Sequence, residues 1–244
     1  MKNDFLKIVL ILARSGSKGI KNKNIKKINN KELIYYTIKS AKHLNPDKII
    51  VSTDSLKIKK IAEKYGAEAP FLRPKKISGD KSTDLECFKH FINWWKIKYY
   101  NIPEIIYHLR ITSPFRKKKN LTDAKKLFLK NESYSSLRSL TNISETPYKM
   151  WKIKNKKALP LIKSNKELHS IGRQYLPQVY NHSGYIDIIR TRKTILKNSM
   201  TGKNILAFVP KDVLDYYIDI DKKNDFEKAK SIFFKNFIKK NEKK

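Results

Sequence analysis

Three basic residues near the start of the chain stand in a segment suited to close approach of an anion: Arg14, Lys18 and Lys23. An apolar run of strand type, 8–12, leads here into a small, glycine-bearing loop. Gly16 and Gly19 let the backbone turn tightly and come close to a ligand, and successive backbone N–H groups in such turns bind anions. The segment predicts a site for a phosphate or polyphosphate. The alternative is a loop that is basic only because the whole chain is rich in lysine.

Two carboxylates lie close together near the other end of the chain, Asp219 and Asp221. The alternating run 215–221 predicts a strand that places both on one face. Such a pair can converge on Mg²⁺, which prefers oxygen ligands and keeps phosphate oxygens in its remaining positions. The alternative is that both residues cap the helix predicted over 224–237. We favour a magnesium site, because acidic residues are scarce in this chain (22 against 55 basic residues) and two close carboxylates need a positive charge beside them.

The composition predicts a single domain over residues 1–240 with a basic tail at 239–244. Hydrophobic residues make up 40% of the 244 residues, which is enough for a sizeable core. No apolar run approaches the roughly 20 residues that span a bilayer, and the first residues lack the form of a signal peptide. Cys87 is the only cysteine, so no internal disulfide can form. We therefore expect a cytoplasmic protein without a membrane segment.

The formal net charge of +33 raises a second class of function, nucleic-acid binding. The charge comes mainly from lysines scattered through predicted helices and loops, and the sequence has neither a helix-turn-helix nor a zinc signature. We therefore expect no nucleic-acid partner and attribute the excess of lysine to a compositional bias.

The elements that must position these residues alternate between strand and helix. Strands are predicted over 8–12, 48–54, 103–109, 134–140, 148–153 and 205–209, and helices over 32–44, 56–65, 83–99, 121–128 and 224–237. This order predicts a parallel sheet of βαβ units. Ligands of such sheets lie beyond the carboxyl ends of the strands, so the polar strand ends near residues 13 and 52 should share one rim.

The N-terminal loop resembles the signature of the cytidylyltransferases that activate nine-carbon acidic sugars, the acylneuraminate cytidylyltransferase family. That signature is a strand, Ala-Arg-x-x-Ser-Lys-Gly and a Lys-Asn pair, matched here by Ala13, Arg14, Ser17, Lys18, Gly19, Lys23 and Asn24. A second motif keeps Thr112, Ser113, Pro114 and Arg116, with Arg110 and Ile111 where glutamine and proline are common. A third keeps Arg173, Gln174, Leu176, Pro177, Tyr180 and Gly184, with Ser183 replacing the usual asparagine. His182 in this third segment is expected to be structural or solvent-exposed, not catalytic.

The resemblance implies roles for individual residues. It implies nucleotide binding by Arg14, Ser17, Lys18, Gly19, Lys23, Asn24, Arg73 and Ser82. It implies sugar binding by Arg110, Thr112, Ser113, Arg173, Gln174 and Ser183. The catalytic set would be Arg14, Lys23, Asp219 and Asp221, with Mg²⁺ on the last two. The departures at Arg110, Ile111 and Ser183 leave the identity of the sugar open. They also keep open the alternative that this chain is a family member that has lost its activity.

The same resemblance implies the fold and the reaction. The fold is a mostly parallel, Rossmann-like α/β sheet of the nucleotidyltransferase, glycosyltransferase-A-like type, flanked by helices. A small arm within about 141–185 would pack on a second subunit, which makes a homodimer. The reaction is transfer of CMP from CTP to the anomeric hydroxyl of a nine-carbon α-keto acid sugar of the sialic, legionaminic or pseudaminic acid type, with release of pyrophosphate. The alternative within enzymes is a cytidylyltransferase for an eight-carbon acid sugar, 3-deoxy-manno-octulosonate, or another sugar nucleotidyltransferase.

Overall fold

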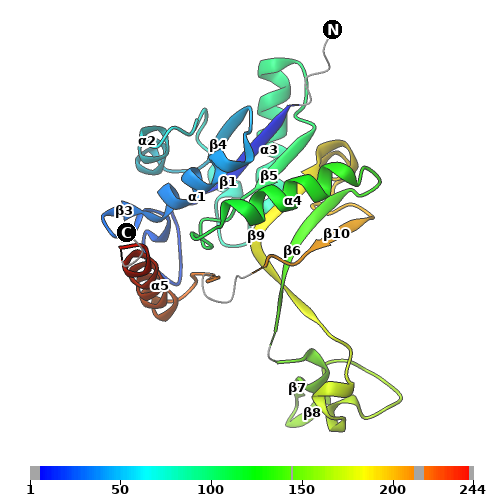
Figure 1. The fold of residues 1–244 in the computed structure, drawn as a ribbon. Coiled ribbons are helices and arrows are strands. Elements are labelled where there is room, and N and C mark those ends of the chain that lie inside the picture. The colour runs from blue at the N-terminus through cyan, green and yellow to red at the C-terminus, as the bar shows by residue number, and fades with distance from the viewer. Residues whose placement is uncertain (1–5, 144, 212–216, 242–244) are drawn as a thin grey trace.

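A six-stranded sheet forms the centre of the molecule in the computed structural model, which describes residues 6–143, 145–211 and 217–241 (Figure 1). Its strands are β1 (Lys7–Leu12), β4 (Lys48–Ser52), β5 (Ile105–His108), β6 (Ser136–Asn142), β9 (Tyr180–Arg190) and β10 (Ile205–Phe208). They are ordered β10-β6-β9-β5-β1-β4. β1 runs parallel to β4 and β5, and β10 runs parallel to β6. The predicted mostly parallel α/β sheet is confirmed.

One strand departs from the parallel arrangement. β9 lies between β5 and β6 and is antiparallel to both. The direction of a strand is set by its partners and by the path of the chain, whereas the side-chain pattern along it is the same in either direction. A mixed sheet therefore could not be distinguished from a parallel one by the apolar pattern of β9.

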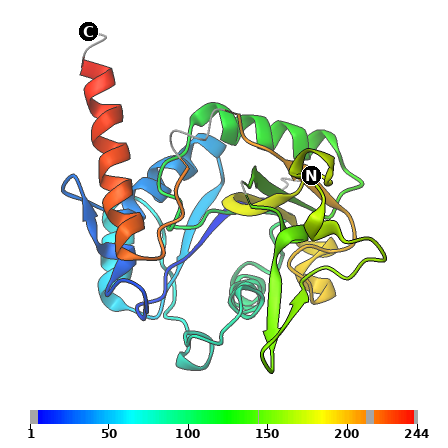
Figure 2. The ribbon, with the colours of Figure 1, turned by 90° about the horizontal axis from the view of Figure 1, so that it is seen from below.

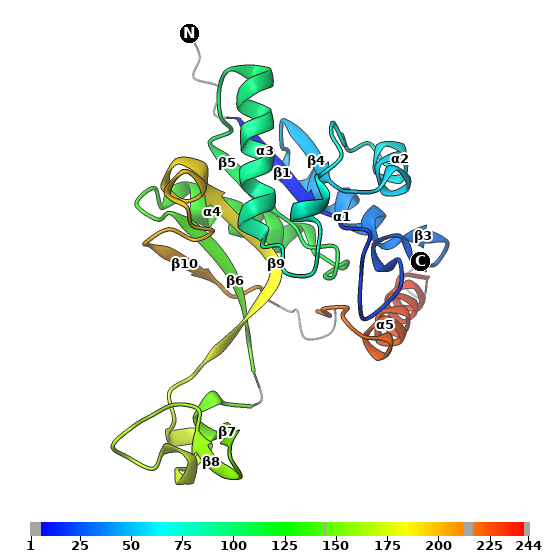
Figure 3. The same cartoon turned by 180° about the vertical axis from the view of Figure 1, so that it is seen from behind.

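Helices cover both faces of the sheet. α1 (Leu33–Ala41) and α4 (Lys118–Lys130) lie on one face, and α3 (Asp84–Tyr99) lies on the other (Figures 1 and 3). The side chains of β1 alternate between the two resulting cores: Val9 and Ile11 belong to one, and Ile8 and Leu10 to the other. Because β1 is apolar on both faces, it can only be a central strand.

The remaining helices lie at the sheet margin and at the C-terminus. α2 (Leu56–Lys64) begins at Ser55, whose hydroxyl accepts from the N–H of Ile58 at 3.3 Å. α3 begins with a capping box, in which Thr83 and Glu86 each accept a hydrogen bond from the other's backbone N–H. α5 (Lys223–Asn241) stands beside the segment that carries the short β2 (Lys27–Ile28) and β3 (Lys31–Glu32) hairpin (Figure 2). No helix of the described residues combines the length and apolar character needed to cross a bilayer.

Strands β6 and β9 extend beyond the sheet as a two-stranded ribbon, and an arm projects from its end (Figures 1 and 3). The arm carries the hairpin of β7 (Trp151–Lys154) and β8 (Lys157–Pro160). The strand predicted over 148–153 begins only at Trp151, because residues Pro147–Lys149 form a 3-10 turn. β8 lies in a stretch where the sequence has no regular pattern.

The strand predicted over 215–221 is wrong for the part that the structure describes. Residues 217–221 form no strand, and Asp215 lies outside the described residues. Ile220 anchors the segment instead: its side chain is buried, and its N–H donates to the carbonyl oxygen of Thr112 at 2.9 Å. The alternating pattern therefore reflects one buried anchor between exposed neighbours, not a paired strand.

Candidate active site

A cavity of about 550 Å³ opens at the carboxyl ends of β1 and β5. It is formed by the loop after β1, the segment between residues 73 and 87, the turn after β5 and the two residues just before α5, Asp221 and Lys222. Its charged and polar lining side chains are Arg14, Ser17, Lys18, Lys23, Asn24, Arg73, Ser78, Asp80, Ser82, Asp84, Cys87, His108, Arg110, Thr112, Asp221 and Lys222. The expected shared rim is present, since the N–H of Ala13 donates to the carbonyl oxygen of Ser52 at 2.9 Å.

The loop after β1 is held in shape by its own side chains. The Asn24 side-chain amide is buried and donates to the carbonyl oxygen of Arg14 at 2.8 Å. Asp54, just after β4, accepts from the backbone N–H of Ser15 at 2.8 Å. Because these bonds fix the loop at both ends, its basic side chains are presented from a preorganised backbone. The immediate role of Asn24 is thus to shape the loop.

The two ends of the chain meet in this cavity. The Lys23 ammonium donates to the carbonyl oxygen of Ile220 at 2.7 Å and to Asp221 Oδ1 at 2.9 Å. A Cβ atom on Gly19 would lie only 2.1 Å from the carbonyl oxygen of Asp221. The basic loop and the acidic segment, separated by about 200 residues in sequence, are therefore in direct contact.

Asp80 neutralises two of the cations that the sequence assigns to phosphate. It lies 3.0 Å from Arg14 Nη1 and 2.9 Å from Lys18 Nζ. The hydrogen bond from Lys18, together with the charges of Lys18 and Arg14, holds the pKa of Asp80 below its ordinary value. Arg14 also donates to the carbonyl oxygen of Gly79 at 2.9 Å. An incoming polyphosphate would compete with the Asp80 carboxylate for both cations.

Arg73 is a buried cation in the cavity wall. It is 5% exposed, and its guanidinium donates to Ser78 Oγ at 3.2 Å and to Cys87 Sγ at 3.1 Å. Its N–H donates to the carbonyl oxygen of Thr53, which fixes the backbone beside β4. Ser82 lines the same wall. Both residues therefore line the same cavity as the phosphate-binding candidates, and their contact with a nucleotide stays a prediction.

Arg110 lines the far side of the cavity with Thr112. Its Nη2 donates to Asp84 Oδ2 at 2.8 Å, and its Cδ would lie 2.8 Å from a Cβ on Gly184, whose φ is +62°. Burial raises the pKa of the Asp84 carboxyl, but its electrostatic interactions with His108 and with the Arg110 guanidinium outweigh burial and leave the pKa below its ordinary value. The Arg110 guanidinium in the cavity wall is therefore already paired with a carboxylate, that of Asp84.

Two serines of the predicted sugar-binding set do not reach the cavity. Ser183 is 1% exposed and donates to Ser139 Oγ at 2.9 Å. Ser113 is 2% exposed, and its hydroxyl points into the protein interior without a partner among the described residues. Both side chains are buried and neither lines the cavity, so neither contacts a substrate there in this conformation.

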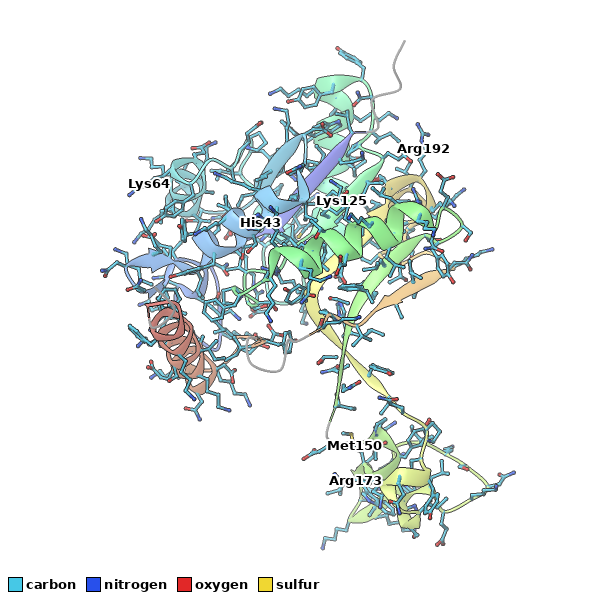
Figure 4. The ribbon with its side chains drawn as sticks, viewed as in Figure 1. His43, Lys64, Lys125, Met150, Arg173 and Arg192 are labelled. Atoms are coloured by element: carbon cyan, nitrogen blue, oxygen red, sulfur yellow. The ribbon has the colours of Figure 1, made fainter. Side chains whose placement is uncertain are left out.

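Arg173 and Gln174 are not brought to the cavity within one chain. Both line a separate hollow on the arm, and Figure 4 places Arg173 far from the sheet. The physical reason is the ribbon of β6 and β9, which carries residues 145–179 away from the body. Their predicted contact with the sugar therefore depends on a second copy of the chain.

Asp219 and Asp221 face different spaces. Asp221 lines the main cavity, whereas Asp219 lines a neighbouring hollow beside α5. Without a regular strand, residues two apart need not share a face, so the expected convergence of the pair is absent. Asp221 supplies one exposed carboxylate beside the basic loop, and Mg²⁺ can bind through one carboxylate plus substrate phosphates. One carboxylate beside the basic loop is compatible with a magnesium ion that also binds substrate phosphates, and both the ion on Asp221 and the role of Asp219 stay predictions.

Comparison with known proteins agrees with this geometry. A family model described as cytidylyltransferase matches residues 8–232. The chain belongs to the cytidylyltransferase family. It is 31% identical to the N-acylneuraminate cytidylyltransferase of Escherichia coli O18:K1:H7 over 92% of its own length, but spans only 51% of that relative. It is 33% identical to the CMP-N,N'-diacetyllegionaminic acid synthase of Campylobacter jejuni, over 89% of this chain and 90% of that protein.

A solved structure shares the fold of this cytidylyltransferase family member. CMP:2-keto-3-deoxy-manno-octonic acid synthetase, complexed with CTP, is similar with a TM-score of 0.66 over 95% of this chain and 99% of that one. The two chains are 13% identical, so the likeness concerns the fold alone. The resemblance that the motifs predict, to acylneuraminate cytidylyltransferases, is confirmed by the family match and by the relatives.

Several lining residues of this cytidylyltransferase family member were missed by the sequence analysis, above all Asp80, Asp84 and His108. Asp84 is the first residue of α3 and His108 the last of β5, so both stand where an element meets the rim. That position was a usable signal, because ligands lie beyond the carboxyl ends of parallel strands. Asp80 lies within residues 78–83, a segment that the family resemblance associates with the nucleotide, but its pairing with Arg14 depends on how this loop folds back on the loop after β1.

Proposed function

We propose that this protein transfers CMP from CTP to the anomeric hydroxyl of a nine-carbon α-keto acid sugar and releases pyrophosphate. The observation that carries the proposal is the contact of Lys23 and Gly19 with Asp221 inside a cavity that Arg14, Lys18 and Arg73 also line. This arrangement joins a polyphosphate-binding loop to a carboxylate that can hold a metal. Family membership and relatives named for sialic and legionaminic acids support the substrate class.

The residues of the chain act mainly by position and charge. The sugar hydroxyl attacks the α-phosphorus of CTP, and the bond to the bridging oxygen of pyrophosphate breaks. Arg14, Lys18 and Lys23 would hold the triphosphate and offset the charge that develops on the leaving group. Arg14 and Lys18 become available as the phosphates replace Asp80. Arg73 would fix the nucleoside end from its buried position.

A magnesium ion belongs to the proposal. Asp221 would hold it, and Asp219 could join as a further ligand only after its side chain changes orientation, because it lines a different hollow. When bound, such an ion neutralises phosphate charge and polarises the phosphorus that is attacked. The Lys23 ammonium lies 2.9 Å from Asp221 and keeps that carboxylate beside the phosphate-binding loop.

The acceptor sugar requires an anion site, and two arginines supply it in the proposal. Arg110 lines the cavity of the same chain, whereas Arg173 would come from the arm of a second subunit in a homodimer. A guanidinium binds a carboxylate through two parallel hydrogen bonds, which suits an acidic sugar.

We also propose a cytoplasmic location, which the single buried thiol of Cys87 supports.

The test measures pyrophosphate release with CTP and a panel of nine-carbon acidic sugars. We expect a preference for CTP over UTP, ATP and GTP, and dependence on Mg²⁺. Asp221→Asn should lose activity by about a hundredfold or more while the thermal midpoint stays close to that of the parent. Asp219→Asn is the matched comparison: full activity in this variant removes Asp219 from the metal site. Equal rates with all four nucleotides, or no release with any acid sugar, overturn the proposal.

A second candidate acceptor is an eight-carbon acid sugar. The fold likeness to CMP:2-keto-3-deoxy-manno-octonic acid synthetase is the observation that favours it. Both acceptors carry a carboxylate beside the anomeric carbon, so Arg110 suits either one. Turnover with 3-deoxy-manno-octulosonate in the same assay, at a higher rate than with any nine-carbon acid, would select this candidate.

A further inference from the structure

His108 ends strand β5 at the floor of the cavity, and one of its ring nitrogens is fixed. Its Nδ1 lies 3.0 Å from the carbonyl oxygen of Leu10 on the neighbouring strand β1. A carbonyl oxygen can only accept, so Nδ1 carries the hydrogen. In the neutral ring Nε2 is then a hydrogen-bond acceptor.

This Nε2 atom is buried and has no hydrogen-bond partner among the described residues. His108 as a whole is 2% exposed, yet it lines the cavity. Asp84 Oδ2 lies 3.9 Å from Nε2, but this oxygen is itself an acceptor and is too far away for a hydrogen bond. A buried acceptor without a donor destabilises a protein, so the unpaired Nε2 of this cavity-lining residue can take a donor from a ligand.

The surroundings keep His108 neutral near pH 7. Burial lowers its pKa, and the positive charge of Arg110 lowers it further. Asp84 on α3, Asp187 on β9 and the Leu10 carbonyl on β1 act in the opposite direction without overcoming burial. The ring of Phe88 on α3 packs edge-on against the imidazole at 5.2 Å between centroids. The acceptor form of Nε2 is therefore the populated one.

A donor stands next to this acceptor. Arg110 Nη2 lies 2.8 Å from the same Asp84 Oδ2, and a guanidinium has five N–H donors, of which Asp84 takes one or two. A ligand atom between Nε2 and Arg110 must therefore donate to one and accept from the other. A hydroxyl does both. A carboxylate or phosphate oxygen would face the Nε2 lone pair with no hydrogen to share.

We propose that His108 Nε2 and the Arg110 guanidinium form a subsite for a substrate hydroxyl, which donates to the imidazole and accepts from the guanidinium. The inference rests on the proposed function, because the hydroxyl belongs either to the acceptor sugar or to the ribose of CTP. Asp84 is a positioning residue here, since it holds Arg110 beside the imidazole.

Two substitutions of His108 test the roles of its two ring nitrogens separately. His108→Asn keeps a donor for the Leu10 carbonyl and removes the acceptor at the Nε2 position. His108→Gln places an amide at the Nε2 position and gives up the Leu10 bond. His90→Asn is the control, because His90 lies on α3 beside Phe71, carries an unpaired buried Nδ1 and does not line the cavity. Circular dichroism and thermal melting verify that each variant is folded.

Steady-state kinetics with each substrate varied in turn then locate the hydroxyl. If it belongs to the sugar, His108→Asn raises KM for the acceptor by about tenfold, leaves KM for CTP unchanged, and His108→Gln recovers part of the loss. If the hydroxyl belongs to the ribose, His108→Asn raises KM for CTP. The deoxy-CTP that lacks this hydroxyl, at the 2′ or the 3′ position, should then have a higher KM than CTP in the parent but the same KM as CTP in the variant. His90→Asn should match the parent in both.

The inference and the proposed function fail in different ways. An active parent whose His108→Asn variant is folded and keeps both KM values and kcat overturns the subsite alone, because a water molecule or nothing then faces Nε2. A loss in His90→Asn equal to that in His108→Asn also overturns it, since the effect is then structural. A parent that neither binds CTP nor releases pyrophosphate overturns the proposed function and this inference with it.

Discussion

At the scale of single residues, two glycines of the same loop, Gly19 and Gly16, differ in the space around them. A Cβ on Gly19 would lie 2.1 Å from the Asp221 carbonyl oxygen, whereas nothing lies within 4 Å of a Cβ on Gly16. Neither residue has a positive φ. Close approach of the C-terminal segment, not backbone conformation, is therefore the reason for Gly19.

This difference gives a matched prediction. Gly19→Ala should push Asp221 away from Lys23 and lower kcat/KM for CTP by about a hundredfold, because the carboxylate and the cationic loop separate. Gly16→Ala should stay within about threefold of the parent, since its methyl group meets open space. Kinetics with CTP as the varied substrate measure both. Equal losses in the two variants would show that the loop tolerates no added side chain anywhere, and would contradict the assigned role of Gly19.

Lys23 carries a second prediction at this scale. Its side chain is 13% exposed and its ammonium bonds both Asp221 and the Ile220 carbonyl. Lys23→Met should lower kcat/KM by about a hundredfold or more, because a charge directed at the phosphates is lost in a partly desolvated site. Lys21→Met, on an exposed position of the same loop, is the control and should be nearly neutral. A Lys23 variant that turns over CTP at the parental rate would remove Lys23 from the catalytic set.

At the scale of elements, β6 and β9 are joined across the sheet by a buried charged cluster. Asp187 on β9 is 1% exposed and accepts from Arg138 on β6 at 2.6 Å. His182 Nε2 lies 2.9 Å from the other carboxylate oxygen, so this histidine has a structural contact, as the sequence predicts. Burial raises the pKa of Asp187, but the hydrogen bond from His182 and the charge of Arg138 outweigh it and lower the pKa.

The cluster predicts an acid-dependent loss of stability. Asp187→Asn should lower the free energy of unfolding by about 3 kcal/mol at neutral pH, because the charge of Arg138 is left uncompensated. A folded-state pKa below the ordinary value of 3.8 means that the stabilisation is present above that pH and is lost as pH falls through the lowered value. Urea unfolding of parent and variant should therefore converge below pH 3.8.

The control for this prediction is an exposed ion pair. Lys119 and Asp123 on α4 lie 2.9 Å apart with side chains 78% and 41% exposed. Asp123→Asn should change the free energy of unfolding by less than about 0.5 kcal/mol. A difference between Asp187→Asn and its parent that persists unchanged through the acidic range would contradict the assignment of the effect to the Asp187 charge.

At the scale of the whole molecule, the arm leaves large apolar side chains in solvent. Ile153 on β7 is 83% exposed, and Trp151 and Leu159 on the same hairpin are 46% and 45% exposed. An isolated two-stranded hairpin has little core of its own. In the proposed homodimer, a second copy of the chain would cover these side chains and would bring Arg173 to a neighbouring cavity.

The oligomeric state is therefore the prediction at this scale. Sedimentation should give a dimer for the parent at micromolar concentration, and Ile153→Glu should shift it toward monomer with a higher KM for the acceptor, because a charge is placed in the apolar contact. Ile97→Glu is the control, since Ile97 is 76% exposed on α3 and lies outside the arm. A parent that sediments as a monomer, or an Ile97 variant that dissociates equally, would contradict a dimer formed through the arm.

The sequence by itself determined the elements and the family. Apolar runs such as that of β1, the Thr83 cap of α3 and the polar residues at strand ends are local patterns, and local patterns are set by backbone and side-chain chemistry within a few residues. The motif around Arg14 fixes polar residue types as well as glycines, which is why it identified the family.

The tertiary structure alone decided which of those residues face one cavity. Asp219 and Asp221 are two residues apart but line different spaces, and Arg173 lies on an arm away from Arg110. Asp84 and His108, which belong to no motif used here, lie beside Arg110. Such contacts depend on sheet order, on the antiparallel direction of β9 and on anchors such as Ile220, none of which is encoded in the spacing of residues along the chain.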